Sequence, residues 1–208
     1  MRARLLVAAS VAVLLGMGAW VTPASAATRC SKAGGTLAQT AGARVFVAQS
    51  NTLRRVFGCA AGQKNARSLG RAGGEGVDTK HLALVGSRVA YVRQSCSEGG
   101  CSASVLVYDL KRRTSVSAAF AAPNDNTDQN VTDIVLSKKG TVAWISEEHA
   151  AGMDPVTARY VAYREPGTGV GIPATPVATG LDILPGTLAL AGRVLYWTQV
   201  TAKAVLLP

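Results

Sequence analysis

The sequence has little of what most enzymes and metal sites depend on. It contains only two histidines, His81 and His149, and it lacks both the Gly-x-Ser-x-Gly elbow of serine hydrolases and the Cys-x-x-Cys spacing of zinc sites. Neither histidine stands near a cysteine in the sequence. We therefore expect no metal and no cofactor, and the absence of any reaction-specific pattern favours a protein that is not an enzyme.

Helical periodicity is also missing after the first 26 residues. No stretch keeps apolar residues at the i, i+3, i+4, i+7 spacing through three turns, whereas short alternating apolar runs recur throughout. A hydrophobic fraction of 48% is enough for a core, and 16% charged residues are too many for a membrane bundle and too few for a disordered tail. The sequence predicts one compact all-β domain.

The first 26 residues have the pattern of an export signal. Arg2 and Arg4 precede an apolar run over residues 5–19, and Ala-Ser-Ala at 24–26 offers the small side chains that a signal peptidase accommodates. The run of about 15 residues is shorter than the ~20 that a membrane-spanning helix needs. We predict a cleaved signal-peptide helix over residues 1–26, no membrane span after cleavage, and a protein that is secreted or held in the cell envelope.

Four cysteines agree with export, because cysteines in an oxidising compartment usually pair. Cys96 and Cys101 enclose a short flexible loop, so a local bridge between them is the first choice among the three possible connectivities. Cys30 with Cys59 then follows by elimination.

Four segments, each centred on a glycine, are typical of related β-hairpins. They are Leu37–Val47, Leu84–Val92, Val135–Ile145 and Leu188–Trp197. In the second and the fourth, an apolar strand turns at Gly86 or Gly192 and returns through Val-x-Tyr. Glycine suits a tight turn that demands positive φ, and alternating Val, Tyr and Trp fit a half-buried strand.

Further strands are expected after each hairpin, so that most repeats have four. The expected third and fourth strands are Thr52–Phe57 with Ala66–Leu69, Ser104–Asp109 with Thr114–Ala118, Arg159–Arg164 with Pro176–Thr179, and Lys203–Leu207 without a fourth. The repeats fall near residues 33–72, 77–122, 131–180 and 181–208, and their glycines are about 44 to 54 residues apart, close to the ~40–50 of propeller repeats. Either Ala27–Lys32 supplies the missing strand and closes a ring, or the ring stays open.

The third hairpin carries a family resemblance. Leu136–Trp144 reads Leu-Ser-Lys-Lys-Gly-Thr-Val-Ala-Trp, which resembles the Ser-Pro-Asp-Gly hairpin of TolB-like β-propeller repeats, with Lys138 and Lys139 in place of Pro-Asp; the Trp-Asp dipeptide of WD40 blades is absent. The resemblance implies a β-propeller-like array of about four four-stranded antiparallel repeats over residues 27–208. It implies binding of proteins or glycans at the channel ends and no particular catalytic residue. A β-sandwich accepts the same strands and is the alternative fold.

Asp78, Asp133 and Asp182 each precede the first strand of a repeat and are candidate binding residues. In a propeller they would lie near one mouth of the channel, where carboxylates bind a cation or an arginine, or raise one another's pKa for acid/base work. Aspartate is equally a common turn residue that accepts hydrogen bonds from backbone N–H groups. Both interpretations stay open at this point.

His149 is the fourth candidate binding residue. It follows Glu147 and Glu148 and precedes Asp154, in the longest insertion of the third repeat, which suits a lid or a binding loop. Two other segments, residues 124–130 and 167–171, resemble a Ca²⁺ loop and a phosphate loop only superficially. The first lacks the EF-hand glycine and glutamate, and the second precedes no helix, so we interpret both as plain loops.

Basic residues outnumber acidic ones by 22 to 12, and the formal charge of +10 falls to about +8 once residues 1–26 are removed. Such an excess attracts anions, which outside a cell are envelope polymers, acidic glycans and lipid headgroups. No aromatic platform accompanies the charges, so nucleic acid is not expected. The sequence favours an exported, monomeric binding or scaffold module for a protein or an anionic cell-envelope polymer. The alternatives are a propeller-type hydrolase or lyase that uses the aspartates, and a truncated propeller without independent activity.

Overall fold

The structure is a computed structural model. It describes residues 34–50, 52–73, 75–98, 100–122, 128–150, 155–167 and 174–208. The predicted signal peptide, the segment Ala27–Lys32, Cys30, Asp154 and most of the polar segments 124–130 and 167–171 lie outside the described residues. No helix within the described ranges is long and apolar enough to cross a membrane.

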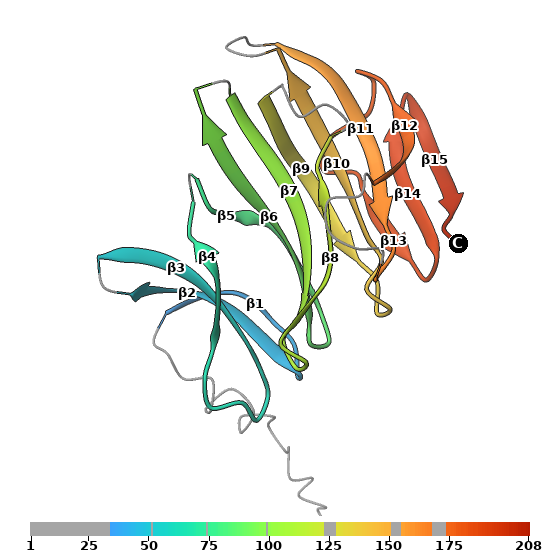
Figure 1. The fold of residues 1–208 in the computed structure, drawn as a ribbon. Helices are drawn as coiled ribbons and strands as arrows, with labels where there is room; N and C mark the ends of the chain where they lie inside the picture. The colour runs from blue at the N-terminus through green and yellow to red at the C-terminus, as the bar shows by residue number, and fades with distance from the viewer. Residues whose placement is uncertain are drawn as a thin grey trace, which may run out of the picture.

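The described residues form an all-β structure in which every predicted hairpin is present (Figure 1). The strands are β1 (Gly35–Gln39), β2 (Ala43–Ser50), β3 (Leu53–Ala60), β4 (Arg67–Arg71), β5 (Val77–Val85), β6 (Arg88–Ser97), β7 (Gly100–Asp109), β8 (Thr114–Phe120), β9 (Asp128–Leu136), β10 (Val142–His149), β11 (Val156–Arg164), β12 (Thr175–Thr179), β13 (Ala189–Ala191), β14 (Val194–Gln199) and β15 (Thr201–Leu206). The expected third and fourth strands match these to within a few residues at their ends.

Each sheet is an antiparallel meander of strands that are consecutive in the sequence. The strands β1–β4, β5–β8 and β9–β12 form four-stranded sheets, and β13–β15 form a three-stranded sheet. None of these sheets closes on itself within the described residues. The four sheets follow one another from one end of the molecule to the other (Figure 1), and β5 contacts both β1 and β9, while β9 contacts β13. This row of meanders is compatible with a propeller-like arrangement.

Three apolar layers, one between each pair of successive sheets, hold the row together. The layer between the first two sheets contains Val45 and Tyr91, the next contains Val105 and Trp144, and the last contains Trp197. Alternate residues of a strand point to opposite faces, so both middle sheets contribute to two layers. The strands of the second and third sheets are buried on both faces because a neighbouring sheet lies on each side.

The face of the first sheet that points away from the second is buried as well. Phe46 and Cys59 have no exposed surface, and the rings of Phe46 and Phe57 stack with their centroids 5.7 Å apart. Cys59 is part of a disulfide. Its predicted partner, Cys30, lies outside the described residues, so that pairing stays a prediction.

Glycine takes the left-handed conformation in three of the four hairpin turns. The φ angles are 60° at Gly86, 103° at Gly140 and 63° at Gly192. Gly42 does not have a positive φ, and the hydroxyl of Thr40 instead accepts a hydrogen bond from the Gly42 backbone N–H at 3.2 Å. The expectation of positive φ is therefore wrong for the first hairpin, because a side-chain hydrogen bond shapes that turn.

The fourth hairpin has the same two-residue turn as the second, but its Val-x-Tyr pattern begins two residues after the turn glycine instead of three. In the second sheet, Val89 and Tyr91 face the preceding sheet. In the last sheet, Trp197 faces the preceding sheet and Tyr196, the residue that the Val-x-Tyr pattern equates with Tyr91, is 42% exposed on the opposite face. A shift of one residue exchanges the two faces of a strand, so the repeat pattern identifies the strand but not its inner face.

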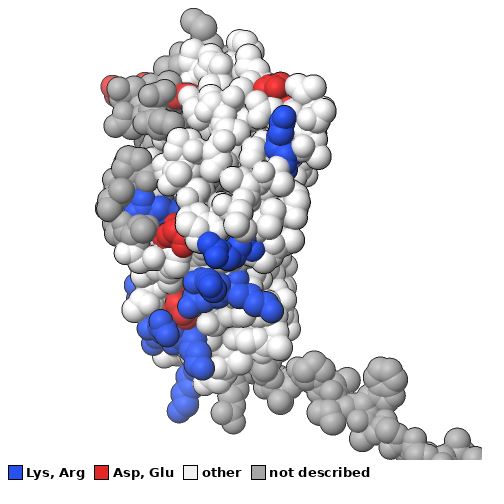
Figure 2. All heavy atoms as spheres, turned by 90° about the vertical axis from the view of Figure 1, so that its right-hand side faces the viewer, with Lys and Arg blue, Asp and Glu red and all other residues white. Residues whose placement is uncertain are grey.

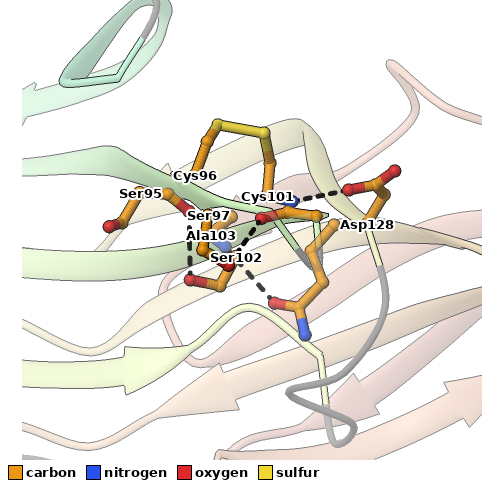
Figure 3. Close-up of a disulfide and its surroundings, with 9 residues drawn as sticks. Ser95, Cys96, Ser97, Cys101, Ser102, Ala103 and Asp128 are labelled. Atoms are coloured by element: carbon orange, nitrogen blue, oxygen red, sulfur yellow. Dashed lines mark hydrogen bonds between the residues drawn. A yellow bond between two sulfur atoms is a disulfide. The ribbon is translucent and has the colours of Figure 1, made fainter. Parts of the chain in front are cut away.

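Cys96 and Cys101 form the disulfide that the sequence predicts (Figure 3). They lie opposite each other in the β6–β7 hairpin. Beside the bridge, Asp128 at the start of β9 accepts a hydrogen bond from the Cys101 N–H at 2.5 Å. The bridge closes the end of the β6–β7 hairpin, and the hydrogen bond to Asp128 ties that hairpin to the third sheet.

Candidate functional site

Asp78 lies within β5 and Asp133 within β9, so the expectation that each aspartate precedes the first strand of its repeat is wrong for these two, because both strands begin earlier than the hairpin pattern indicates. The three candidate aspartates have separate partners. An oxygen of Asp78 lies 2.6 Å from Nδ1 of His81, and its other oxygen accepts from the backbone N–H two residues later at 2.7 Å. Asp133 accepts at 2.7 Å from the backbone N–H of Leu188, which ties the third sheet to the segment before β13. These two carboxylates therefore stabilise local backbone and contacts between sheets.

Asp182 lies in the turn before β13 and accepts a hydrogen bond from the Gln199 side chain at 3.1 Å. No hydrogen bond or ion pair in the described part of the chain joins any two of Asp78, Asp133 and Asp182. The described part of the chain contains no group of three or more His, Cys, Asp or Glu side chains that could hold a metal.

His149 lies at the end of β10 beside a carboxylate network. Its Nε2 is 4.0 Å from an oxygen of Glu147, whose other oxygen accepts from the Arg159 guanidinium at 2.8 Å. The buried Glu148 accepts from the hydroxyl of Tyr160 at 2.7 Å. Burial and, next to it, this hydrogen bond raise the pKa of Tyr160 to about 12. The network links β10 to β11 across one sheet.

A different group of residues comes together at one end of the row of sheets. The turns that join first to second strands and third to fourth strands all lie at this end, which we call the turn face. It consists of residues 40–42, 61–66, 86–87, 110–113, 137–141, 165–167 and 192–193. It is the lower end of the molecule in Figure 1.

Hydrogen bonds between turns of successive sheets make the turn face continuous. The Thr40 hydroxyl donates to the Gly86 carbonyl at 2.8 Å, which links the first sheet to the second. The Gln63 amide makes a second link by donating to the Leu110 carbonyl at 2.9 Å. Arg88 donates to a backbone carbonyl of the third sheet's turn, that of residue 138. The turns of the first three sheets are thus linked into one surface.

The turn face carries most of its charge as cations. Its basic residues are Lys64, Lys111, Arg112, Arg113, Lys138, Lys139 and Arg193, and Arg67, Arg88 and Arg164 directly adjoin it. Only two of the described acidic residues, Asp109 and Glu165, lie at this end, and the other eight lie toward the opposite end. Figure 2 shows lysine and arginine gathered over the lower half of the molecule, seen from the end formed by the last sheet.

Asp109 is held by the backbone of its own turn. One of its oxygens accepts from the N–H groups of Lys111 and Arg112, both at 3.0 Å, and from the Ser87 hydroxyl at 3.2 Å. Arg88 pairs with the other oxygen at 3.7 Å. Burial alone would raise the pKa of Asp109, but these hydrogen bonds and the nearby cation outweigh it and lower the pKa. The buried carboxylate therefore shapes the basic turn and leaves its lysine and arginine side chains exposed.

The turn face contains a pocket of about 740 Å³ between the turns of the last three sheets. Its apolar floor is formed by the strand ends Val85, Leu136, Leu190 and Leu207. Lys138, Lys139 and Arg193, all exposed, line its rim, and Glu165 is its one acidic lining residue. A cavity with an apolar floor and a cationic rim suits a ligand with anionic groups on a partly apolar frame.

Sequence reasoning noted the two lysines but missed the pocket and Arg193. The sequence does contain a signal for Arg193. It directly follows the turn glycine Gly192, and its turn is equivalent in the repeat to the turn that contains the two lysines. No protein-family model matches the chain, and no curated protein or solved structure matches it significantly. The function is therefore inferred from the chemistry of the turn face itself.

Proposed function

We propose that the protein is an exported binding module, built as an open TolB-like β-propeller array, whose turn face binds an anionic cell-envelope polymer. Export is supported by the signal pattern of residues 1–26 and by the disulfide between Cys96 and Cys101. The propeller interpretation is supported by the consecutive meanders and by the resemblance of the third hairpin. A β-sandwich is the alternative to it.

The observation that carries the proposal is the cationic rim of the 740 Å³ pocket. Lys138, Lys139 and Arg193 line it together, and the other acidic residue at this end, Asp109, already accepts hydrogen bonds from its own turn. Charges on adjoining turns act together on an anion because the Debye length at physiological salt is about 8 Å. The site therefore selects for negative charge.

A polymer fits this surface better than a single small anion. The cations continue from the pocket across the turns of the second sheet to Lys64 in the first. Each exposed ion pair contributes only about 0.2–1 kcal/mol, so useful affinity needs many of them at once. One polymer molecule with repeated anionic groups can make many such contacts at the same time.

No observation favours the hydrolase or lyase alternative. Its candidate acid/base residues, Asp78, Asp133 and Asp182, are hydrogen-bonded to different partners, and none of them lines the cationic pocket. The truncated-propeller alternative predicts no ligand at all, so a binding experiment separates it from our proposal.

The test is binding of dextran sulfate, with neutral dextran as the ligand control, measured over a range of salt concentrations. Lys138→Glu/Lys139→Glu should weaken binding by about ten-fold or more and flatten its salt dependence, because two cationic contacts become repulsive. Lys80→Glu/Lys203→Glu changes the net charge equally at two exposed sites away from the turn face and should change binding much less.

Two results would contradict the proposal. Equal losses in the two double variants would mean that net charge alone, and not the turn face, attracts the polymer. Absence of salt-sensitive binding to dextran sulfate in the unmodified protein would remove the function itself.

A further inference from the structure

The last sheet has an uncovered apolar face. On the side away from the third sheet, the strand register places Ala189, Ala191, Val194, Tyr196, Thr198, Ala202, Ala204 and Leu206. This outer face contains no charged side chain, and its two largest residues, Tyr196 and Leu206, are 42% and 67% exposed. Figure 2 looks onto this end and shows a broad area without charge above the basic turns.

The opposite end of the row offers no equivalent face. Phe46 and Cys59 on the outer side of the first sheet have no exposed surface. A second copy therefore cannot stack its last sheet on the first sheet of its neighbour. Among the two ends of the row, the surface that matches the uncovered face is therefore the same face of another copy.

We propose that two copies of the chain associate through this outer face, last sheet against last sheet. Such a contact is isologous and closes at the dimer, since each copy has one uncovered end. The face suits its own copy because uncharged residues repel neither each other nor an apolar partner. Its four alanines also let two sheets approach to the usual ~10 Å spacing.

The size of the face indicates a reversible dimer. β13 has three residues and β14 and β15 have six each, so strands spaced ~4.8 Å apart with ~3.4 Å per residue form a flat area of roughly 250 Å², and their corrugated surface exposes roughly 500 Å² once the margin is included. That margin contains Leu184 and Val200, which are 48% and 80% exposed. Two copies together then bury roughly 1,000 Å², the lower limit for a specific interface.

Charge at the two ends of the last sheet selects the orientation of the dimer. Arg193 lies in the turn at one end of the face, and Asp182 lies in the segment before β13 at the other. If the strands of the two copies ran in the same direction, the two basic turn faces would lie side by side and repel each other. A two-fold axis across the strands instead places each turn face beside the opposite end of the partner's last sheet, where Asp182 and Lys203 leave little net charge.

Sedimentation of the purified protein over a concentration series, without any polymer, tests the proposal. The average mass of the unmodified protein should rise toward that of a dimer. Leu206→Glu should remain monomeric at every concentration, because it places a charge inside the contact, at the end of β15. Leu53→Glu, which alters another exposed leucine in the first sheet, should associate as the unmodified protein does.

An unmodified protein that stays monomeric up to its solubility limit would overturn the proposal. Association of Leu206→Glu equal to that of the unmodified protein would overturn it too, since the contact would then lie elsewhere, for example along the free edge of β15. Thermal unfolding of both variants in dilute solution verifies that each is folded. Failure of the dimer leaves polymer binding by the turn face unaffected, so the two proposals fail separately.

Discussion

Asp109 determines the shape of the most basic turn in the molecule. Its carboxylate accepts hydrogen bonds from the Lys111 and Arg112 N–H groups, so a negative charge inside the turn orders the cationic residues around it. The pKa of Asp109 is lowered in the folded protein by these hydrogen bonds and by Arg88, against the effect of burial. An unfolded chain keeps the ordinary aspartate value of about 3.9.

Stability should therefore depend on pH through this residue. Because the folded protein binds the Asp109 proton more weakly than the unfolded chain, the stabilisation is fully present above about pH 4 and is lost as the pH falls further toward the lowered folded pKa. Asp109→Asn should be less stable at neutral pH and should lose less free energy of unfolding on acidification. Urea unfolding over a pH series measures both effects. Parallel acid curves for the two proteins would contradict this role.

The candidate carboxylates show what a single residue's sequence position does not reveal. The position of Asp133 before a hairpin makes it a candidate binding residue, but its partner is the Leu188 N–H, 55 residues later in the chain. Nothing local marks Asp109 as a candidate, since it resembles other aspartates at strand ends. The role of a carboxylate depends on which backbone N–H groups the packed sheets bring to it. The local sequence pattern does not predict those groups.

At the scale of the strand and hairpin, local pattern was more informative. Turn glycines and alternating apolar residues are short-range signals, and they located all four hairpins. The Val-x-Tyr pattern alone does not give the inner face of a strand. Tyr196 matches Tyr91 in the pattern but faces outward, because it follows its turn glycine by four residues and Tyr91 follows its own by five.

This difference between faces predicts unequal costs for similar substitutions. Trp144 is fully buried between the second and third sheets and donates to the Ala121 carbonyl at 2.8 Å. Trp144→Phe removes that hydrogen bond and leaves a gap, and should lower the free energy of unfolding by about 1–3 kcal/mol. The Ser146 hydroxyl still donates to the same carbonyl at 2.6 Å, which limits the loss.

Tyr196→Phe is the matched control for this substitution. Tyr196 is 42% exposed on the outer face, so removing its hydroxyl should change stability by less than about 0.5 kcal/mol. Urea unfolding in dilute solution compares the two variants without association. Similar losses would show that Trp144 does not hold the second and third sheets together.

At the scale of the whole molecule, the two outer faces of the row of sheets differ in burial, and the two ends of its strands differ in charge. One outer face is buried and the other is uncovered, and the cations concentrate on the turn face. The basic excess was visible in the composition, and the missing fourth strand was visible in the last repeat. The cationic pocket was not, because its lining combines turns from three sheets that only the packed structure brings together.

Hydrogen–deuterium exchange with and without dextran sulfate reports where on the protein the polymer binds. Binding at the turn face should slow exchange in the turns 110–113, 137–141 and 192–193 and leave residues 180–188 at the opposite end unchanged. Protection confined to the opposite end, or spread evenly over all four sheets, would contradict it.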